Sequence, residues 1–332
     1  MKKTYWILAS LILTLILVLI TFLLMLWSDT YSNTHYERTH FYSEPNKNVL
    51  KVNYILNHKN TYDSFIFGSS RVGNINPLKL SNGKYYNMTY SEGLPKEHFL
   101  NIQLFIQEGV KIKNLLIGLD EFSYQVSFLK HQHQGLTKAY FQATDTNIFT
   151  YYRELYFRFP LSEDRHHIKK KLFHSPNYFS MDISKQERNY KHAEKEFNVS
   201  QYNTKSHLND PRFSKPTFYN GNFLNESLEN IQKIQNTCAT NNINCKFFIN
   251  PIHHKTYAYT NKKLLFKFKE ELAKITDFYD FSEPNEISKD NRYWLDTSHY
   301  RLDIGDLIIK TIYNDKVYVK SFGTHIKKEE KE

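Results

Sequence analysis

The sequence predicts an α/β fold in which a parallel sheet is covered by helices on both faces. Short apolar runs of strand length alternate with amphipathic helical stretches, first within residues 61–120 and again within residues 222–314. Strands that are joined by helices run parallel, because the chain must cross over before it re-enters the sheet. The chain of 332 residues is long enough to bury a large core around such a sheet.

The chain begins with an apolar segment that is long enough to cross a membrane. Residues 5–27 carry no charge, and as a helix they would span about 34 Å, against a hydrocarbon core of about 30 Å. The run ends without the small residues of a signal-peptide cleavage site, so we expect residues 1–27 to be an uncleaved anchor. Lys2 and Lys3 precede it and predict a cytoplasmic N-terminus. We therefore expect a single-pass protein of the inner (cytoplasmic) membrane with a periplasmic C-terminal domain.

The part that follows the anchor is basic. The chain has a formal net charge of +10, which falls to +8 when Lys2 and Lys3 are left out. The basic residues are dispersed, and the tightest run is Lys169-Lys170-Lys171. This pattern favours contact with lipid headgroups or acidic glycans over nucleic acid, and ordinary solvated surface charge is the alternative.

The elements before the middle of the chain follow a regular order. Residues 28–60 are polar, aromatic and Asn-rich, and we expect them to form a stalk. The α/β domain is then expected over residues 61–320. Its first half contains predicted strands at 64–67, 85–90 and 113–120, with a helix from Pro95 to Gly109.

The alternation stops in residues 121–221, which are rich in Tyr, Phe, His and Lys. We interpret them as a lid or cap insertion, because segments at the carboxyl ends of parallel strands shape ligand binding in open α/β sheets. No carboxylates stand at suitable spacing from its histidines, so we expect no metal site and no cofactor. Those histidines are His131, His133, His166, His167 and His174. Residues 196–200 also fit an extended bacterial glycosylation sequon.

The alternation resumes near residue 222 and continues to the end of the domain. A helix at 224–238, a strand at 245–251, a helix at 265–272, a strand at 278–281 and a helix at 302–313 are predicted, followed by a charged tail at 321–332. Cys238 and Cys245 fall at a helix end and in the strand after it. Their spacing permits either a disulfide in an oxidising exterior or two buried thiols.

Two short motifs in this framework could carry out nucleophilic catalysis. Ser70 ends a Gly-Ser-Ser turn after the first sheet strand, and Asp296 and His299 stand on a short loop before the last helix. A serine attacks well only when a base takes its proton, and a histidine does so best when a carboxylate holds its other nitrogen. Taken separately, the two motifs are also common turn and helix-capping sequences.

The two motifs resemble those of the SGNH, or GDSL-like, hydrolase superfamily, whose nucleophile is the serine of Gly-Asp-Ser and whose last motif is Asp-x-x-His. The similarity is closest to membrane-anchored members such as the DltD-type proteins of D-alanyl transfer and the alginate-acetylation proteins. It covers about residues 64–120 and 222–314. It implies a flavodoxin-like three-layer sandwich with Ser70, Asp296 and His299 as the catalytic residues.

The middle motifs of that superfamily match less well. Its second motif supplies a glycine amide to the oxyanion, and the corresponding region here offers Thr89, Ser91 and Gly93. Its third motif is Gly-x-Asn-Asp, where this chain has Asp120 in place of the asparagine. An ionised carboxylate cannot donate a hydrogen bond, and loss of one oxyanion donor typically costs about 3 kcal/mol. The backbone amide of Ser70 or Arg71 could contribute instead, so we expect Arg71, Thr89, Ser91, Gly93 and Asp120 to surround the substrate.

The resemblance implies an acyltransferase that acts on a cell-envelope glycan, together with a membrane-bound O-acyltransferase partner that delivers the acyl group. An esterase that removes acyl groups would use the same triad. A non-catalytic assembly or glycan-binding factor with the same fold is the alternative from another class, and Asp120 favours it. The sequence specifies neither the acyl group, the glycan nor the oligomeric state.

Overall fold

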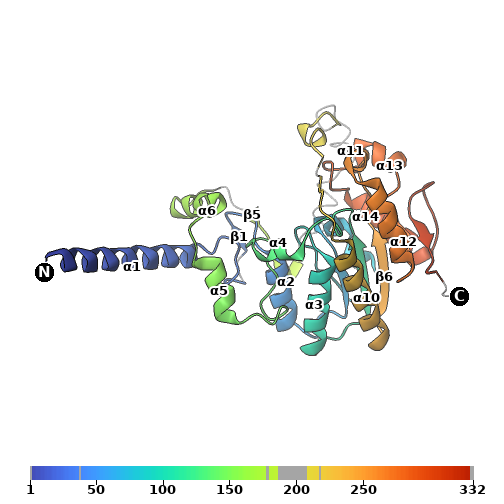
Figure 1. Cartoon of the computed structure of the whole chain (residues 1–332). Coiled ribbons are helices and arrows are strands. Elements are labelled where there is room, and N and C mark those ends of the chain that lie inside the picture. The colour runs from blue at the N-terminus through green and yellow to red at the C-terminus, as the bar shows by residue number, and fades with distance from the viewer. Residues whose placement is uncertain (1, 37–38, 177–178, 186–207, 217, 330–332) are drawn as a thin grey trace.

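The chain forms an α/β fold around a six-stranded, mostly parallel sheet. The computed structural model describes residues 2–36, 39–176, 179–185, 208–216 and 218–329 (Figure 1). The strand order in the sheet is β3-β2-β4-β6-β7-β8, and only β8 runs antiparallel. This confirms the predicted α/β fold with a mostly parallel sheet. The strands are β2 (Ser64–Phe67), β3 (Tyr85–Asn87), β4 (Asn114–Leu119), β6 (Asn244–Ile249), β7 (Phe278–Asp280) and β8 (Thr324–Ile326).

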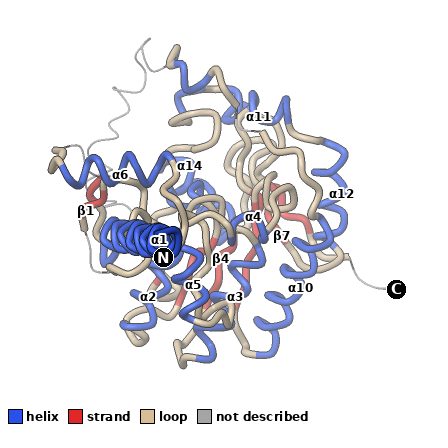
Figure 2. The backbone as a smooth tube through the Cα atoms, turned by 60° about the vertical axis from the view of Figure 1, so that its left-hand side comes forward, coloured by secondary structure: helices blue, strands red, loops and turns tan. Residues whose placement is uncertain are grey.

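Helices cover both faces of the sheet, because successive strand residues point to opposite sides. Phe65 and Phe67 belong to one core cluster and Ile66 to the other. One face is covered by α2 (Lys47–Asn57), α3 (Pro95–Gln107), α10 (Leu224–Thr240) and α12 (Lys262–Ala273). The other is covered by α14 (Leu302–Asn314), with the 3₁₀ helix η1 (Ser70–Asn74) and α13 (Glu286–Lys289). Figures 1 and 2 show this layered arrangement.

Two parts of the chain differ from the sequence-based expectation. The expected stalk contains α2, whose side chains Val49, Val52 and Ile55 are fully buried in the main core. In the sequence this apolar stripe is interspersed with Asn and Lys residues, so the composition of the segment indicated a polar stalk. The expected charged tail contains β8, which pairs with β7 at the edge of the sheet. Both segments therefore belong to the folded domain.

Helix α1 (Lys2–Ser28) projects from the domain (Figure 1). Within Thr4–Ser28, the apolar 18-residue window has a mean hydropathy of 3.1, and none of this window is buried against the rest of the protein, whereas Met25 and Ser28 at the end of the helix are buried. Among the described residues it is the one helix long and apolar enough to cross a membrane.

The expected insertion has two distinct parts. Its ends pack beside the sheet, whereas α5 (Ile148–Tyr156) and α6 (Ser162–Leu172) lie beside the end of α1 (Figures 1 and 2). Residues 196–200, the predicted sequon, lie outside the described residues. The remaining elements are short: α4 (Phe128–Gln132), α11 (His254–Tyr259), the β1–β5 pair (His40–Phe41 with Phe179–Ser180), η2 (Pro77–Lys79), η3 (Ile183–Lys185), η4 (Pro211–Phe213) and η5 (Asn291–Tyr293).

The two cysteines are free thiols on neighbouring elements. Cys238 is buried in α10, and Cys245 stands at the start of β6. Burial and the adjacent Cys238 thiol raise the pKa of Cys245, so it stays protonated at neutral pH.

Candidate active site

The Ser70 hydroxyl is presented by a tight turn at the carboxyl end of β2. Gly68 adopts φ +154°, and a Cβ there would lie 2.6 Å from Val72 Cγ1, so no other residue fits. Ser69 then caps η1, its hydroxyl accepting a 3.3 Å hydrogen bond from the Arg71 amide. Ser70 is the first residue of η1, where backbone amides have no carbonyl partner within the helix. Its amide is thus available to an oxyanion, whereas that of Arg71 is engaged.

Asp296 and His299 stand on a closed loop directly before α14. A backbone bridge between Trp294 and Tyr300 closes this loop at its base. Inside it, Asp296 Oδ1 accepts hydrogen bonds from the amides of Ser298 at 2.7 Å and His299 at 2.8 Å. The aspartate therefore fixes the loop that carries the histidine.

The two loops bring the predicted triad together. Ser70 Oγ lies 2.8 Å from His299 Nε2, and His299 Nδ1 lies 2.9 Å from Asp296 Oδ2. These distances are within hydrogen-bond range, although 229 residues separate the serine from the histidine. The side chains of His299 and Asp296 remain 31% and 30% exposed, so a substrate could reach them.

The carboxylate of Asp296 is held in its ionised form. Burial alone would raise its pKa, but hydrogen bonding and attraction from His299, with the amides of Ser298 and His299, lower it to about 2. An ionised carboxylate at this position orients the imidazole and stabilises it when it gains a proton.

Further contacts lock the serine turn to the histidine loop. Arg71 Nη2 donates to Ser298 Oγ at 3.2 Å, and Asn74 Nδ2 donates to the Tyr300 carbonyl at 2.7 Å. A Cβ on Gly305 of α14 would lie 2.0 Å from the Asn74 carbonyl, so glycine is needed for this close approach. The Ser70 to His299 distance is therefore set by several independent contacts.

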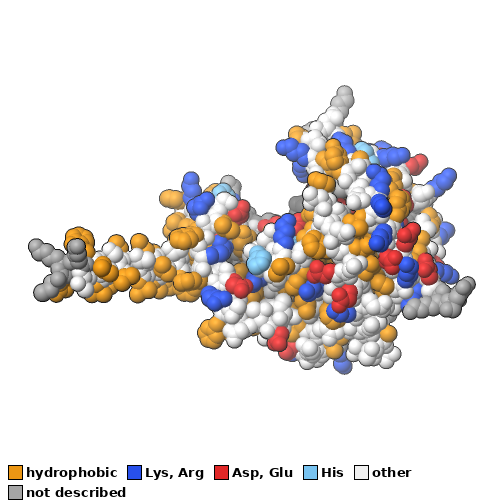
Figure 3. Space-filling model, viewed as in Figure 1, with side chains coloured by type: hydrophobic (Ala, Val, Ile, Leu, Met, Phe, Trp, Pro, Cys, Tyr) orange, Lys and Arg blue, Asp and Glu red, His pale blue; other side chains and the backbone are white. Residues whose placement is uncertain are grey.

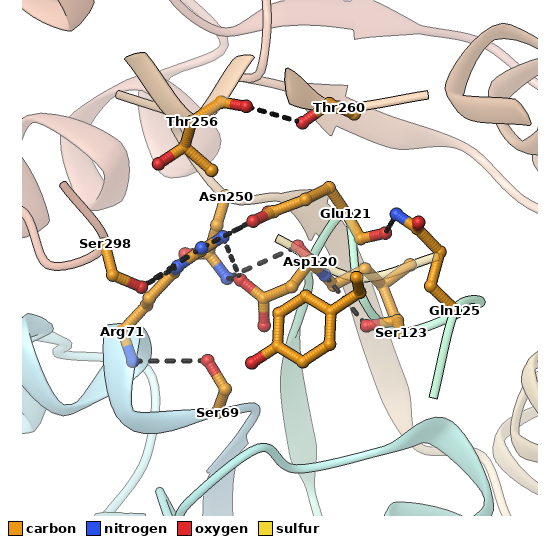
Figure 4. A network of polar contacts seen from close by, with 12 residues as sticks. Ser69, Arg71, Asp120, Glu121, Ser123, Gln125, Asn250, Thr256, Thr260 and Ser298 are labelled. Atoms are coloured by element: carbon orange, nitrogen blue, oxygen red, sulfur yellow. Dashed lines mark hydrogen bonds and ion pairs between the residues drawn. The ribbon is translucent and has the colours of Figure 1, made fainter. Parts of the chain in front are cut away.

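Arg71, Asp120 and Glu121 form a buried ion cluster next to the serine turn (Figure 4). Arg71 Nη1 donates to Asp120 Oδ1 at 3.0 Å and to Glu121 Oε2, and Nη2 donates to Glu121 Oε1 at 2.7 Å. Asn250, at the end of β6, donates to Asp120 Oδ1 at 3.1 Å. Burial raises the pKa of Asp120 to about 6, with Arg71 opposing and Glu121 adding to the rise.

The cluster changes the roles expected for two of the predicted residues. Arg71 is 1% exposed and Asp120 is fully buried, so neither guanidinium nor carboxyl faces a substrate. Their bonds instead connect the serine turn, the end of β4 and the histidine loop. We therefore assign them to positioning the triad rather than to contacting the oxyanion.

The three residues expected from the second motif have separate positions. Thr89 is buried and its hydroxyl donates to the Ser69 carbonyl at 2.6 Å, which holds the serine turn. The Ser91 hydroxyl donates to Glu44 at 3.0 Å at the surface. A Cβ on Gly93 would lie 2.8 Å from the Gly68 carbonyl, so glycine lets the β3–α3 loop approach the turn. The hydroxyls of Thr89 and Ser91 thus donate to groups other than the Ser70 side chain.

A buried histidine ties the insertion to this β3–α3 loop. His131 Nδ1 lies 2.8 Å from Glu97 Oε1, and its Nε2 lies 3.3 Å from Glu92 Oε2. Tyr219 donates to Glu92 Oε1 at 2.7 Å. Burial would lower the pKa of His131, but the two carboxylates raise it to about 9, so it is charged at neutral pH.

Several residues that support the site were missed at the sequence level. Glu121, Asn250 and Ser298 act only through partners that are distant in the sequence, so no local pattern marks them. The charged pair Asp120-Glu121 at the end of a buried strand was the one available signal, because adjacent buried carboxylates need a cation.

The fold and this geometry define a class: an α/β protein with a Ser-His-Asp arrangement at the carboxyl edge of a parallel sheet. Within the described ranges, no group of three or more His, Cys, Asp or Glu side chains could hold a metal. No protein-family model matches the chain, and no match was found among the curated proteins.

Proposed function

We propose that this protein transfers acyl groups through a covalent intermediate on Ser70. The observation that carries the proposal is the hydrogen-bonded series from Ser70 Oγ through His299 to Asp296. The series lies where the strands of open α/β sheets carry their ligand sites, at the carboxyl ends. The pKa of Asp296, about 2, keeps the orienting group ionised over the physiological pH range.

The proposed reaction has two steps. His299 Nε2 takes the proton of Ser70 as Oγ attacks the acyl carbonyl, and the tetrahedral intermediate expels the donor group, which receives that proton. An acceptor hydroxyl then gives its proton to His299 and attacks the acyl-serine, and Ser70 regains the proton as it leaves. The Ser70 amide, at the start of η1, would stabilise the oxyanion in both steps.

The substrate and the cellular setting are part of the proposal. The resemblance to membrane-anchored SGNH-like proteins supports a cell-envelope glycan as acceptor and a membrane-bound O-acyltransferase as acyl donor. Helix α1 supports an inner-membrane anchor, and Lys2 and Lys3 support a periplasmic location for the remainder. The basic character of the domain suits an acidic glycan.

A serine-directed fluorophosphonate probe tests the nucleophile in the full-length chain. We expect the probe to label the wild type, with labelling lost in Ser70→Ala and reduced in His299→Ala. Ser91→Ala is the matched control, because its hydroxyl bonds to Glu44 at the surface. Equal labelling of the wild type and Ser70→Ala would refute the proposal.

An acetyl ester then separates transfer from hydrolysis. We expect acetyl transfer to a sugar acceptor to exceed release of acetate, and both to require Ser70. Acetate release at an equal rate without acceptor would show that the protein is an esterase.

A second candidate function, that of a non-catalytic glycan-binding or assembly factor, is favoured by Asp120. The third motif here offers a buried carboxylate that is bonded to Arg71, where the superfamily has an asparagine donor. A well-folded wild-type protein that neither reacts with the probe nor releases acetate would establish this candidate.

A further inference from the structure

Two exposed hydrophobic side chains of the insertion lie beside the anchor helix, and a third follows them closely in the sequence. Phe157 and Phe159 are 59% and 85% exposed, and Leu161 is 56% exposed. All three stand in the connection between α5 and α6, and Phe157 and Phe159 line a groove against α1. Figure 3 shows hydrophobic side chains along α1 and where it meets this part of the chain, with Lys and Arg beside them. Such a concentration of exposed apolar surface usually marks an interaction site.

The connection reaches along α1 to the depth of the hydrocarbon. A groove of about 400 Å³ lies between Phe157 and Phe159 on one side and α1 residues 14–22 on the other. The rings of Phe22 and Phe157 are 6.2 Å apart. Over Thr4–Ser28 the helix is about 37 Å long, so it extends beyond the hydrocarbon core by only about 4 Å at each end. Phe22 lies about 9 Å before the end of α1 and is therefore within the hydrocarbon. A bilayer that α1 crosses therefore also meets these phenylalanines.

The position of α5 and α6 relative to α1 is fixed by one buried hydrogen bond and by contacts of Lys171. Tyr156 at the end of α5 donates to Asp29 Oδ1 at 2.6 Å, and Asp29 is fully buried directly after α1. Lys171 of α6 lies 4.4 Å above the ring of Trp27 and donates to the Ser28 carbonyl at 3.2 Å. The connection cannot swing away from the anchor without breaking these bonds.

The charges around the connection suit a membrane surface. Arg158, which lies between the two phenylalanines in the sequence, donates through Nη1 and Nη2 to the buried carboxylate of Asp164; the Nη2 contact is 3.1 Å long. The ion pair compensates the charge of Arg158 in a place where water is scarce. The last turn of α6 carries Lys169, Lys170 and Lys171. Basic residues and an aromatic ring such as Trp27 are the groups that proteins place at headgroup level.

We propose that the α5–α6 connection, residues 157–161, is seated in the lipid leaflet that the carboxyl-terminal half of α1 crosses. Acyl chains fill the groove against α1, and the basic end of α6 contacts anionic headgroups. This part of the insertion is then a second membrane contact that holds the domain against the bilayer, and not a lid over the triad. The inference rests on α1 crossing a membrane and is independent of catalysis at Ser70.

Spin-label accessibility in vesicles tests the proposal on the full-length chain. A nitroxide is attached to F159C, in a background with Cys238→Ser and Cys245→Ser, after reconstitution into vesicles that contain anionic lipid. Leu15→Cys, on α1 but outside the groove lining and 69% exposed, reports the hydrocarbon, and Phe149→Cys, 83% exposed at the other end of α5, is the matched control. We expect the F159C label to collide with dissolved oxygen in preference to a water-soluble nickel chelate, as the L15C label does, while the F149C label shows the reverse.

Two outcomes would overturn the proposal. A label at F159C that is as accessible to the nickel chelate as the one at F149C would place the connection in water, leaving the groove for a partner protein. Spin–spin broadening between F159C labels, lost on dilution with unlabelled protein, would show that a second copy fills the groove. Since residue 159 is exposed and Ser70 is unchanged, neither outcome bears on the acyl-transfer proposal.

Discussion

At the scale of single residues, Arg71 is the side chain on which the site depends most. It is a buried cation that faces two carboxylates and also holds Ser298 on the histidine loop. Breaking such a cluster by removing one partner costs about 3–5 kcal/mol, because the remaining charges stay buried without compensation. The cost arises from the unpaired carboxylates and not from the lost guanidinium itself.

We therefore expect Arg71→Met to lower the free energy of unfolding by about 3–5 kcal/mol. Adding Asp120→Asn and Glu121→Gln should restore most of the loss, since no charge is then buried alone. Denaturation of the detergent-solubilised chain, followed by circular dichroism, measures both effects. A triple variant that is no more stable than Arg71→Met would show that Arg71 acts through packing.

Because Asp120 ionises within this cluster, the loss of stability in Arg71→Met should depend on pH. The folded pKa of Asp120, about 6, lies above its ordinary value of 3.8. Its contribution to stability is thus fully present below pH 3.8 and is lost as the pH rises through 6. Without Arg71 the folded pKa rises further, so the stability of Arg71→Met should continue to fall above pH 6. A parallel pH profile for the wild type and the variant would contradict the assignment.

At the scale of elements, the sheet and most of its helices could be predicted, because each has a local signal. The runs at Phe65-Ile66-Phe67 and Leu115-Leu116-Ile117 are apolar on both faces, as buried parallel strands must be. The burial of α2 and the pairing of β8 depend on partners elsewhere in the fold, so composition alone misplaced both. Ser70, Asp296 and His299 could be predicted for the same reason as the strands, since short motifs carry them.

The His131 contact shows how one insertion residue stabilises the loop beside the serine turn. Its charged ring lies between Glu97 and Glu92, and the folded pKa of about 9 lies above the ordinary 6.5. The resulting stability is fully present below pH 6.5 and is lost as the pH rises through 9. Lys130 is a nearby positive charge that helps to lower the pKa of Glu92, and the neutral Tyr219 hydroxyl donates to the same carboxylate.

We expect His131→Gln to be less stable than the wild type at pH 6 and to approach it above pH 9. The difference in unfolding free energy between the two proteins, measured from pH 5 to 10, reports the titration directly. His133→Gln is the control, because His133 lies outside this cluster at the end of α4. A difference that does not change with pH would show that the imidazole acts by shape alone.

At the scale of the whole molecule, the proposed chemistry requires the domain and its glycan to lie on the same side of the membrane. The basic residues that decide orientation are few. Lys2 and Lys3 stand in the first turn of α1, before its apolar run, and the first Lys or Arg residues after α1 are Arg38 and Lys47. The lysines lie closer to the apolar run, so they should retain the N-terminus in the cytoplasm.

We expect alkaline phosphatase that is fused after Glu332 to be active in intact cells, because that enzyme works only outside the cytoplasm. A fluorescent protein that matures only in the cytoplasm should stay dark at the same position. Changing Lys2 and Lys3 to Glu leaves the positive charge of Arg38 and Lys47 and should invert part of the population, with phosphatase activity falling and fluorescence rising together. A substitution of Lys47 would be a poor control for charge, because Lys47 also pairs with Glu44 in the folded domain. The control is Lys316→Glu, a surface change far from α1 in the sequence. A fluorescent wild-type fusion without phosphatase activity would place the triad in the cytoplasm, where it could not reach an envelope glycan, while leaving its geometry and its reactivity toward a serine probe unaffected.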